Sequence, residues 1–265
     1  MEQDNEEVVE WVEEEEAITW GDDRIVIKGN LQTIDFQSGE PVLAMNNLCK
    51  NYQLGTVEVQ ALRNIDLIIN EGDYVAIMGP SGSGKSTLLN MIGCLDHPSS
   101  GNYFLGGQNV SELNDDQLSL IRGERVGFIF QSFNLISQLN IIENIEIPMY
   151  YQGFSEHESA ERAKELATMV GLGERLKHRP SELSGGQQQR VAIARSLAND
   201  PFIILADEPT GNLDSESGHE ILKLLDKLHE QGKTLITVTH DDNIAAHAKR
   251  IVRLFDGEIE KQEYK

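Results

Sequence analysis

The stretch that most limits the fold of this chain is residues 79–86, which read GPSGSGKS and fit the pattern G-x-x-x-x-G-K-[ST]. Five largely apolar residues, 74–78, precede it, and apolar residues at helical spacing follow it from Leu88 to Ile92. Glycines let the backbone wrap so that successive N–H groups point to one place, and a following helix adds the positive end of its dipole. The sequence therefore predicts a strand, a tight turn and a helix that together bind phosphate groups.

Two side chains of this turn indicate what the rest of the ligand is. Lys85 is a point charge that reaches the β- and γ-phosphates of a nucleoside triphosphate, and the Ser86 hydroxyl is a ligand for Mg²⁺. The pattern indicates a P-loop nucleoside triphosphatase, but by itself it does not separate kinase, GTPase, helicase and transporter ATPase. The residues expected to bind the nucleotide here are Gly79, Ser81, Gly82, Ser83, Gly84, Lys85, Ser86 and Thr87.

Two adjacent carboxylates, Asp207 and Glu208, follow a second apolar run at residues 202–206. Ligands gather at the carboxyl ends of strands in open α/β sheets, so we expect both side chains at the nucleotide site. We predict that Asp207 holds Mg²⁺ through a coordinated water and that Glu208 polarises the attacking water as general base. A GTPase is disfavoured because no Asn-Lys-x-Asp pattern is evident.

The remaining sequence alternates between strand and helix patterns. Apolar runs at residues 126–130 and 235–239 predict two further buried strands, and residues 251–259 predict a hairpin that turns at Asp256 and Gly257. Helical spacing is evident at residues 159–170 and 221–228. This alternation is typical of an α/β domain with a largely parallel sheet.

The first 40 residues differ from the rest in charge. They hold 13 Asp and Glu against 2 Lys and Arg, half of the formal net charge of −22. We interpret residues 1–40 as an acidic N-terminal extension and residues 41–265 as the main domain. Two interpretations of the extension stay open: a disordered acidic tail, or a docking segment with Trp11 and Trp20 as anchors and an apolar stripe if residues 6–17 are helical.

Charge and hydropathy exclude several classes of function. A net charge of −22 opposes nucleic-acid binding, which needs a clustered basic surface. No run of about 18 apolar residues occurs, and the acidic N-terminus has no apolar signal segment. We therefore expect a cytoplasmic protein that does not cross a membrane itself. Cys49 and Cys94 share no metal-ligand spacing and are interpreted as idle thiols.

The pentamer LSGGQ at residues 183–187, continued by QQRVAIAR, carries the most specific signal. By average composition the pentamer arises by chance in roughly one chain in several thousand. A helix that opens with a serine and two glycines also makes an anion-binding end suited to a γ-phosphate. On these motifs the chain resembles the ABC ATPases over residues 42–260.

The resemblance implies both a fold and an assembly. The fold is a P-loop NTPase of ABC type, with a mostly parallel core sheet, an antiparallel β subdomain and an inserted helical signature subdomain at about residues 135–185. The assembly is a head-to-tail dimer, which we expect to be a homodimer, with two ATP molecules at its interface. Neither monomer would then be a complete enzyme. The signature residues expected to meet ATP bound to the opposite subunit are Ser184, Gly185, Gly186 and Gln187.

Four other residues match family motifs in order. The resemblance implies that Tyr52, placed before the first sheet strand, stacks on adenine, although core packing is the competing interpretation. It implies that Gln131 contacts Mg²⁺ and water, that Asp214 belongs to a loop packed across the dimer, and that His240 holds the γ-phosphate. Catalysis is thereby assigned to Lys85, Gln131, Glu208 and His240, and Mg²⁺ binding to Ser86, Gln131 and Asp207.

Local strings at residues 91–96 and 131–135 are similar to one branch of the family, the ATPases of MacB-type exporters and of lipoprotein release. This branch implies an ATP-hydrolysing subunit that powers a separate MacB-like permease for export, lipoprotein release or transmembrane force transmission. It also implies attachment to the cytoplasmic face of the inner or plasma membrane through the coupling helices of that permease. The apolar residues at 141–149 fit either the groove for a coupling helix or the core of the helical subdomain.

The alternative is a soluble ABC ATPase without a transport role. Members that act on DNA carry long coiled-coil or zinc insertions between the P-loop and the signature. Only 98 positions separate Lys85 from Leu183, and no coiled-coil pattern lies between them. We therefore favour the transport subunit, with ATP and Mg²⁺ as its ligands.

Overall fold

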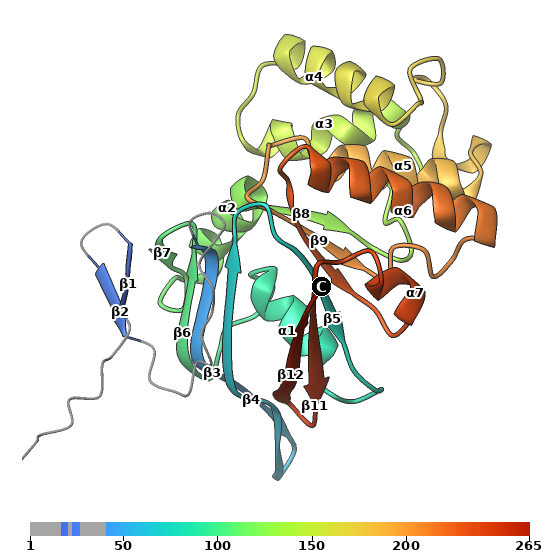
Figure 1. The fold of residues 1–265 in the computed structure, drawn as a ribbon. Coiled ribbons are helices and arrows are strands. Elements are labelled where there is room, and N and C mark those ends of the chain that lie inside the picture. The colour runs from blue at the N-terminus through green and yellow to red at the C-terminus, as the bar shows by residue number, and fades with distance from the viewer. Residues whose placement is uncertain (1–16, 21–22, 27–40) are drawn as a thin grey trace, which may run out of the picture. The chain divides into compact units, whose positions relative to one another are not determined.

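The computed structural model describes residues 17–20, 23–26 and 41–265 (Figure 1). The chain divides into two compact units, residues 1–36 and 37–265. In the first unit, β1 (Ala17–Trp20) pairs antiparallel with β2 (Asp23–Val26). The helix considered for residues 6–17 lies outside the described residues except at Ala17, which begins β1. Trp11 also lies outside them, so the nature of the extension stays a prediction.

The second unit is built on a six-stranded sheet with the order β12-β11-β5-β10-β9-β8. Four of its strand pairs are parallel, and only the edge pair β11–β12 is antiparallel. Its strands are β5 (Tyr74–Met78), β8 (Val126–Ile129), β9 (Ile203–Asp207), β10 (Thr234–Val238), β11 (Arg250–Phe255) and β12 (Glu258–Tyr264). The mostly parallel core sheet expected from the sequence is confirmed, with strand ends within one or two residues of the predicted ones outside the final hairpin.

A four-stranded antiparallel sheet accompanies the core sheet, with the order β4-β3-β6-β7. Its strands are β3 (Pro41–Leu54), β4 (Val57–Asn70), β6 (Ser100–Leu105) and β7 (Gln108–Asn109). The antiparallel β subdomain implied by the resemblance is thus confirmed, although the sequence pattern did not reveal its two 14-residue strands. Register shifts interrupt their pairing, and Asn47 and Asn64 adopt φ angles of 46° and 44°. Such bulges break the simple alternation by which strands are found in a sequence.

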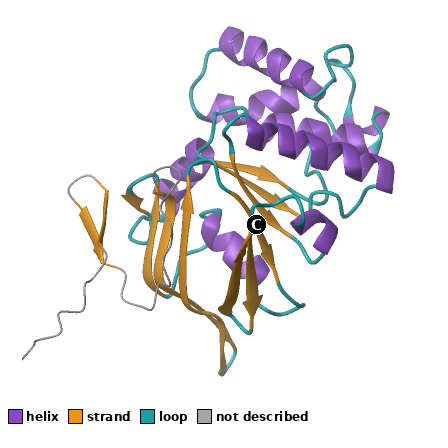
Figure 2. Ribbon diagram, in the orientation of Figure 1, coloured by secondary structure: helices purple, strands orange, loops and turns teal. Residues whose placement is uncertain are grey.

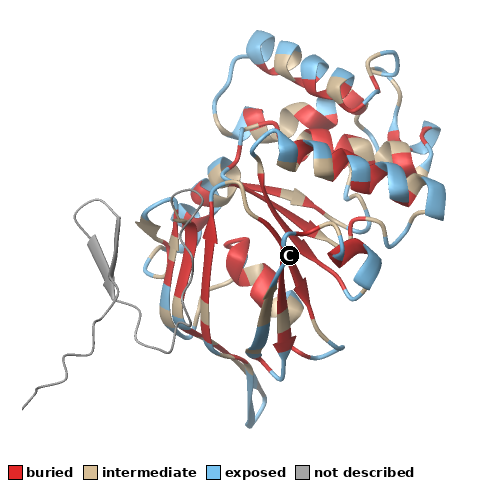
Figure 3. Ribbon diagram, viewed as in Figure 1, coloured by how far each residue is buried: buried red, intermediate tan, exposed pale blue. Residues whose placement is uncertain are grey.

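The core sheet separates two hydrophobic cores (Figure 3). Val75 and Ile77 pack into the core shared with the antiparallel sheet, α1 (Lys85–Ile92) and α2 (Asp115–Arg125). The alternate residues of β5, Tyr74, Ala76 and Met78, pack into the other core, under the helices. Because side chains alternate along a strand, an apolar residue at every position means that both faces of the sheet are covered.

The helices of the second core are α3 (Ile141–Tyr151), α4 (Glu156–Met169), α5 (Gly185–Ser196) and α6 (Ser215–Glu230), with the short α7 (Asp242–Ala245) near the edge strands (Figures 1 and 2). A 3₁₀ turn, Pro180–Glu182, precedes α5. Helix α4 begins three residues before the predicted start, because Ser155 and Glu158 form a reciprocal capping box there. Of these helices, α3 and α4 lie within residues 135–185, the range predicted for the helical subdomain, whereas α5 and α6 follow it.

Candidate nucleotide site

The phosphate-binding turn connects β5 to α1. Lys85 Nζ donates hydrogen bonds to the carbonyl oxygens of Gly79 at 2.7 Å and Pro80 at 2.8 Å, so its ammonium lies across the turn. Gly84 is the N-cap of α1 with a φ of 101°, and no side chain caps the helix. The first N–H groups of α1 are therefore not used by a cap, which suits them to bind an anion.

The glycines of the turn are required by close contacts. A Cβ on Gly79 would lie 2.3 Å from Leu254 O, and a Cβ on Gly84 would lie 2.7 Å from Ala61 O. The turn is also held by a hydrogen bond from Gly257 N to Ser83 O at 3.0 Å. The loop is thus fixed against both the antiparallel sheet and the β11–β12 hairpin.

Sheet topology brings the sequence motifs together. Strands β5, β10, β9 and β8 are adjacent and parallel. At their carboxyl ends follow the phosphate loop after β5, His240 after β10, Asp207 and Glu208 at the end of β9, and Gln131 after β8. Residues up to 161 positions apart in the chain therefore collect at one edge of one sheet. This is the edge at which open α/β sheets bind their ligands.

The carboxylate of Glu208 is held in one orientation. Its Oε1 accepts a hydrogen bond from His240 N at 3.0 Å and lies 2.6 Å from His240 Nδ1, and its Oε2 accepts from Thr239 Oγ1 at 3.0 Å. The Glu208 side chain is 16% exposed and that of His240 is 78% exposed. Glu208 also has a φ of 44°, an uncommon backbone conformation for a non-glycine residue.

Asp207 lies beside Glu208 in a half-buried position. Burial raises the pKa of the Asp207 carboxyl, the negative charge of Glu208 raises it further, and the ammonium of Lys85 lowers it. Two neighbouring carboxylates with one partly compensating cation form a site that favours an additional positive charge.

The segments that contain Gln131 and Asp214 are joined within the subunit. Gln131 Nε2 donates to Asn212 Oδ1 at 3.4 Å, and Asn212 Nδ2 donates to Gln131 O at 3.0 Å. Gly211 permits this approach, because a Cβ there would lie 2.5 Å from Gln131 Nε2. Asp214 caps α6 by accepting a hydrogen bond from Ser217 N at 2.9 Å.

The signature residues form the start of α5. Ser184 is the N-cap, its Oγ accepts from Gln187 N at 3.3 Å, and Gln187 Oε1 accepts from Ser184 N at 3.0 Å. Cβ atoms on Gly185 and Gly186 would lie 3.2 Å and 3.1 Å from the side chains of Leu213 and Ser217. Ser184 is exposed, and in the described part of the chain no hydrogen bond joins the signature to the phosphate loop.

Tyr52 lies inside β3 rather than before the first strand of a sheet, which corrects the placement made from the sequence. It is half-buried and belongs to neither hydrophobic core. Its hydroxyl donates to Asp96 Oδ2 at 2.9 Å. Burial is the main cause of a raised pKa of this hydroxyl, and the Asp96 carboxylate adds to it.

Two residues of the site, Thr239 and Asn212, were missed by sequence reasoning. Thr239 is fully buried and bonds the Glu208 carboxylate, and Asn212 bonds Gln131. The sequence offered one signal for each residue, its position beside a predicted site residue. Thr239 directly precedes His240, and Asn212 lies two residues before Asp214.

The sequence profile of the family described as ABC transporter matches residues 62–211, more than half of the chain. The chain belongs to the ABC transporter family. An uncharacterised ABC transporter ATP-binding protein from Thermotoga maritima is 55% identical over 219 residues, which are 83% of this chain and 94% of that protein. The macrolide export ATP-binding/permease protein MacB from Hyphomonas neptunium is 51% identical, again over 83% of this chain.

The chain spans about a third, 34%, of the length of that MacB protein. Among solved structures, the ATP-binding cassette MJ0796, a dimer bound to ADP and Pi in a post-hydrolysis state, is 49% identical with a TM-score of 0.76. The alignment covers 84% of this chain and 98% of that one. These findings confirm the fold class, and they identify the chain as an ATP-binding and ATP-hydrolysing subunit of the ABC transporter family.

A groove of about 500 Å³ lies beside Gln131, between the core sheet and α3. The apolar part of its wall includes Leu120, Phe128, Phe130, Pro148 and Tyr151. Of the apolar residues at 141–149, only Pro148 contributes, whereas Ile141, Ile145 and Met149 are fully buried in the core of the helices. Most of the segment therefore belongs to the core of the helices, and Pro148 reaches the groove.

Helix α5 reaches the same groove through Arg195. Its guanidinium donates to Asn134 O at 2.6 Å and Phe133 O at 2.9 Å. Phe133 and Asn134 have φ angles of 61° and 49°, and burial lowers the pKa of Arg195. The helix that begins with the signature is therefore bonded to the loop that follows Gln131.

Proposed function

We propose that the chain is the motor of an ABC transport machine, which uses ATP hydrolysis to drive a separate MacB-like membrane permease. The observation that carries the catalytic part is the convergence of Lys85, Gln131, Glu208 and His240 at the ends of four adjacent strands. The permease part is supported by the MacB relatives, whose names include both ATP-binding and permease functions. The Thermotoga relative, of which the chain covers 94%, supports a subunit that works beside a separate membrane protein.

In the proposed mechanism, two subunits face each other head to tail. The phosphate loop and Lys85 of one subunit bind the triphosphate, and the exposed start of α5 in the other meets the γ-phosphate. Because the two glycines contribute backbone N–H groups and Ser184 contributes a hydroxyl at a helix N-terminus, they stabilise negative charge that develops there. The dimer of the MJ0796 cassette supports this arrangement.

Glu208 acts as general base toward the attacking water. Its carboxylate is oriented by Thr239 and by the backbone of His240, so the oxygen that accepts the proton is held in a fixed position. The His240 ring contacts the same carboxylate and is largely exposed, which supports its proposed contact with the γ-phosphate. Hydrolysis then releases the contacts that hold the two subunits together.

The residues proposed for Mg²⁺ fit that ion by their chemistry. Ser86, Gln131 and Asp207 offer hydroxyl, amide and carboxylate oxygens, the hard donors that Mg²⁺ prefers. Burial raises the pKa of Asp207 and the charge of Glu208 raises it further, so a nearby cation would stabilise the charged carboxylate. Among the described residues no group of three or more His, Cys, Asp or Glu forms a metal cage, which agrees with an ion held jointly with nucleotide phosphates. Bound there, Mg²⁺ neutralises charge on the β- and γ-phosphates.

The groove beside Gln131 is the proposed docking site for a coupling helix of the permease. It is apolar at Phe128, Phe130 and Tyr151, and Tyr151 is largely exposed. Arg195 bonds its floor to the signature helix, which gives a path from the ATP site to the membrane protein. In the described part of the chain no helix is both long and apolar enough to cross a bilayer. The MacB relatives support the proposed location on the cytoplasmic face of the membrane, where the permease would hold the subunit.

The test is affinity capture of tagged Glu208→Gln protein with Mg-ATP from detergent-solubilised native membranes, followed by mass spectrometry. We expect recovery of a permease with a large extracytoplasmic domain. Tagged Lys85→Ala protein, which lacks the phosphate contact, serves as the control for ATP-dependent capture. Recovery of soluble partners alone would contradict the transport role and favour the alternative, a soluble ABC ATPase.

A further inference from the structure

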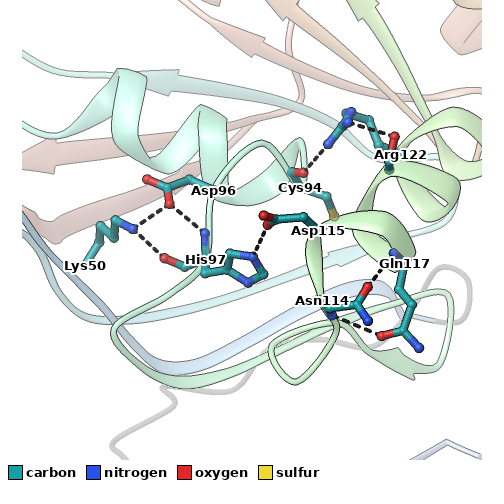
Figure 4. A network of polar contacts seen from close by, with 9 residues as sticks. Lys50, Cys94, Asp96, His97, Asn114, Asp115, Gln117 and Arg122 are labelled. Atoms are coloured by element: carbon teal, nitrogen blue, oxygen red, sulfur yellow. Dashed lines mark hydrogen bonds and ion pairs between the residues drawn. The ribbon is translucent and has the colours of Figure 1, made fainter.

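A polar network joins β3 to the segment that follows the phosphate-binding helix α1, and Asp96 is at its centre (Figure 4). Asp96 Oδ1 accepts hydrogen bonds from Lys50 Nζ at 2.6 Å and from His97 N at 2.7 Å. Lys50 Nζ also donates to His97 O at 2.7 Å. On the other side of the carboxylate, Oδ2 accepts from Tyr52 Oη at 2.9 Å. A single carboxylate therefore holds two side chains of β3.

Lys50 and Tyr52 also contact each other. Lys50 Nζ lies over the Tyr52 ring, 4.9 Å from its centroid, which is within the range of a cation–π interaction. The ammonium thus occupies one face of the ring, and a nucleobase stacks only on the opposite face. Because Asp96 binds both the hydroxyl and the ammonium, it fixes the orientation of the ring and the face that is closed.

The protonation of the network favours these bonds. Burial is the largest influence on the pKa of Asp96 and raises it, but the bonds from Lys50, Tyr52 and His97 together bring the pKa below its ordinary value of 3.8. The carboxylate is therefore charged at neutral pH and accepts from all three donors. The raised pKa of Tyr52 keeps its hydroxyl protonated, so that hydroxyl is the donor.

The network also fixes where the Tyr52 ring stands relative to the phosphates. Helix α1 carries the phosphate loop at its N-terminus, and Asp96 follows its C-terminus. The intervening turn is held by Arg122, which donates to Cys94 O at 2.7 Å, where Cys94 has a φ of 52°. The distance between the aromatic ring and the phosphate loop is thereby set through a short, bonded segment.

We propose that Asp96 is a positioning residue for the nucleotide: it holds the Tyr52 ring where it stacks on the base, with Lys50 closing the opposite face. The inference rests on the proposed role of Tyr52 as the base-stacking residue. It predicts that Asp96 acts on the base and not on the phosphates. A purely structural joint between β3 and α1 would instead affect both alike.

The test compares binding of MgADP with binding of inorganic diphosphate, which has no base, by isothermal titration calorimetry. Asp96→Asn is expected to weaken MgADP binding about tenfold, the size of one lost hydrogen bond to a charged group, and to leave diphosphate binding unchanged. The matched control is Asp115→Asn, which removes the partner of His97 at 2.7 Å without touching Tyr52 or Lys50. It is expected to change neither affinity.

A second pair of variants separates positioning from folding. In a Tyr52→Leu background, Asp96→Asn should have no further effect on MgADP, because the ring it positions is gone. Tyr52→Phe keeps the ring, removes the hydroxyl and should weaken MgADP binding several-fold, a test that holds even if Asp96→Asn fails to fold. Equal losses for MgADP and diphosphate, or an undiminished Asp96→Asn effect without the ring, would overturn the proposal.

The same titrations keep the proposal separate from the proposed function. If the wild-type protein binds MgADP no more tightly than diphosphate, that result would contradict base stacking by Tyr52 and the role of Asp96 that depends on it. It would not contradict the proposed phosphate binding and hydrolysis. If the wild-type protein binds neither MgADP nor diphosphate, that result would instead contradict the nucleotide site itself.

Discussion

Replacement of Thr239 by Val tests how Glu208, the proposed general base, is held. Val keeps the approximate shape of this fully buried side chain but removes the hydroxyl that donates to Glu208 Oε2 at 3.0 Å. A hydrogen bond to a charged group contributes about 1.5–3 kcal/mol, and about 1.4 kcal/mol corresponds to a factor of ten in rate. If most of this energy serves to orient the carboxylate, kcat falls about 10- to 100-fold. The affinity for ATP is unchanged, because Thr239 has no role toward the phosphates.

Steady-state ATPase kinetics and nucleotide titration measure the two quantities. The matched control is Thr234→Val, at the first residue of β10, the strand that Thr239 directly follows. Thr234 is buried, and its Oγ1 accepts a hydrogen bond from Gly72 N at 3.0 Å. It therefore lies at the opposite end of the strand from Thr239. This control loses a buried hydrogen bond and some stability, but keeps the wild-type kcat. The reasoning is refuted if Thr239→Val hydrolyses ATP at the wild-type rate, or if both variants lose the same fraction of kcat.

Three further predictions follow from the site and its surroundings. Lys85→Ala should weaken binding of ATP by at least about tenfold in a titration, since it removes a point charge from the phosphates; unchanged affinity would contradict the role of the loop. Tyr151→Glu places a charge in the proposed docking groove and should reduce capture of the permease, whereas Phe154→Glu, at an exposed residue outside the groove wall, should not. Asp96 has a lowered pKa in the folded state, so its contribution to the free energy of unfolding is present above pH 3.8 and is lost as pH falls through the folded pKa. Denaturant titrations should therefore show a weaker acid dependence in Asp96→Asn, and an unaltered dependence would be evidence against the network.

The edge of the sheet that carries the candidate site was predictable because short sequence motifs mark it. The phosphate loop, the Asp207–Glu208 pair and His240 each follow an apolar run that reads as a buried strand. Parallel strands in one sheet end at the same edge, so the motifs had to converge once the alternation of strands and helices was recognised. The strand order, which places β10 between β5 and β9, came only from the structure.

The parts that sequence reasoning missed depend on contacts between distant segments. The Tyr52–Asp96 bond joins residues 44 positions apart, and the Arg195–Phe133 bond joins residues 62 apart. The two residues of each pair are not related by a helical or strand repeat, so the sequence gives no sign that they are in contact. The bulged strands β3 and β4 were missed for a related reason, since register shifts remove the alternation that marks a strand.

The central claim is that Glu208 is the general base of an ATPase that works as a dimer. The most direct measurement is analytical ultracentrifugation of the Glu208→Gln variant with Mg-ATP, combined with an assay of phosphate release. The variant keeps the size of the side chain and removes the basic carboxylate. We predict an ATP-bound dimer in which phosphate release is abolished. A Glu208→Gln protein that hydrolyses ATP at the wild-type rate, or that stays monomeric while ATP is bound, would contradict it.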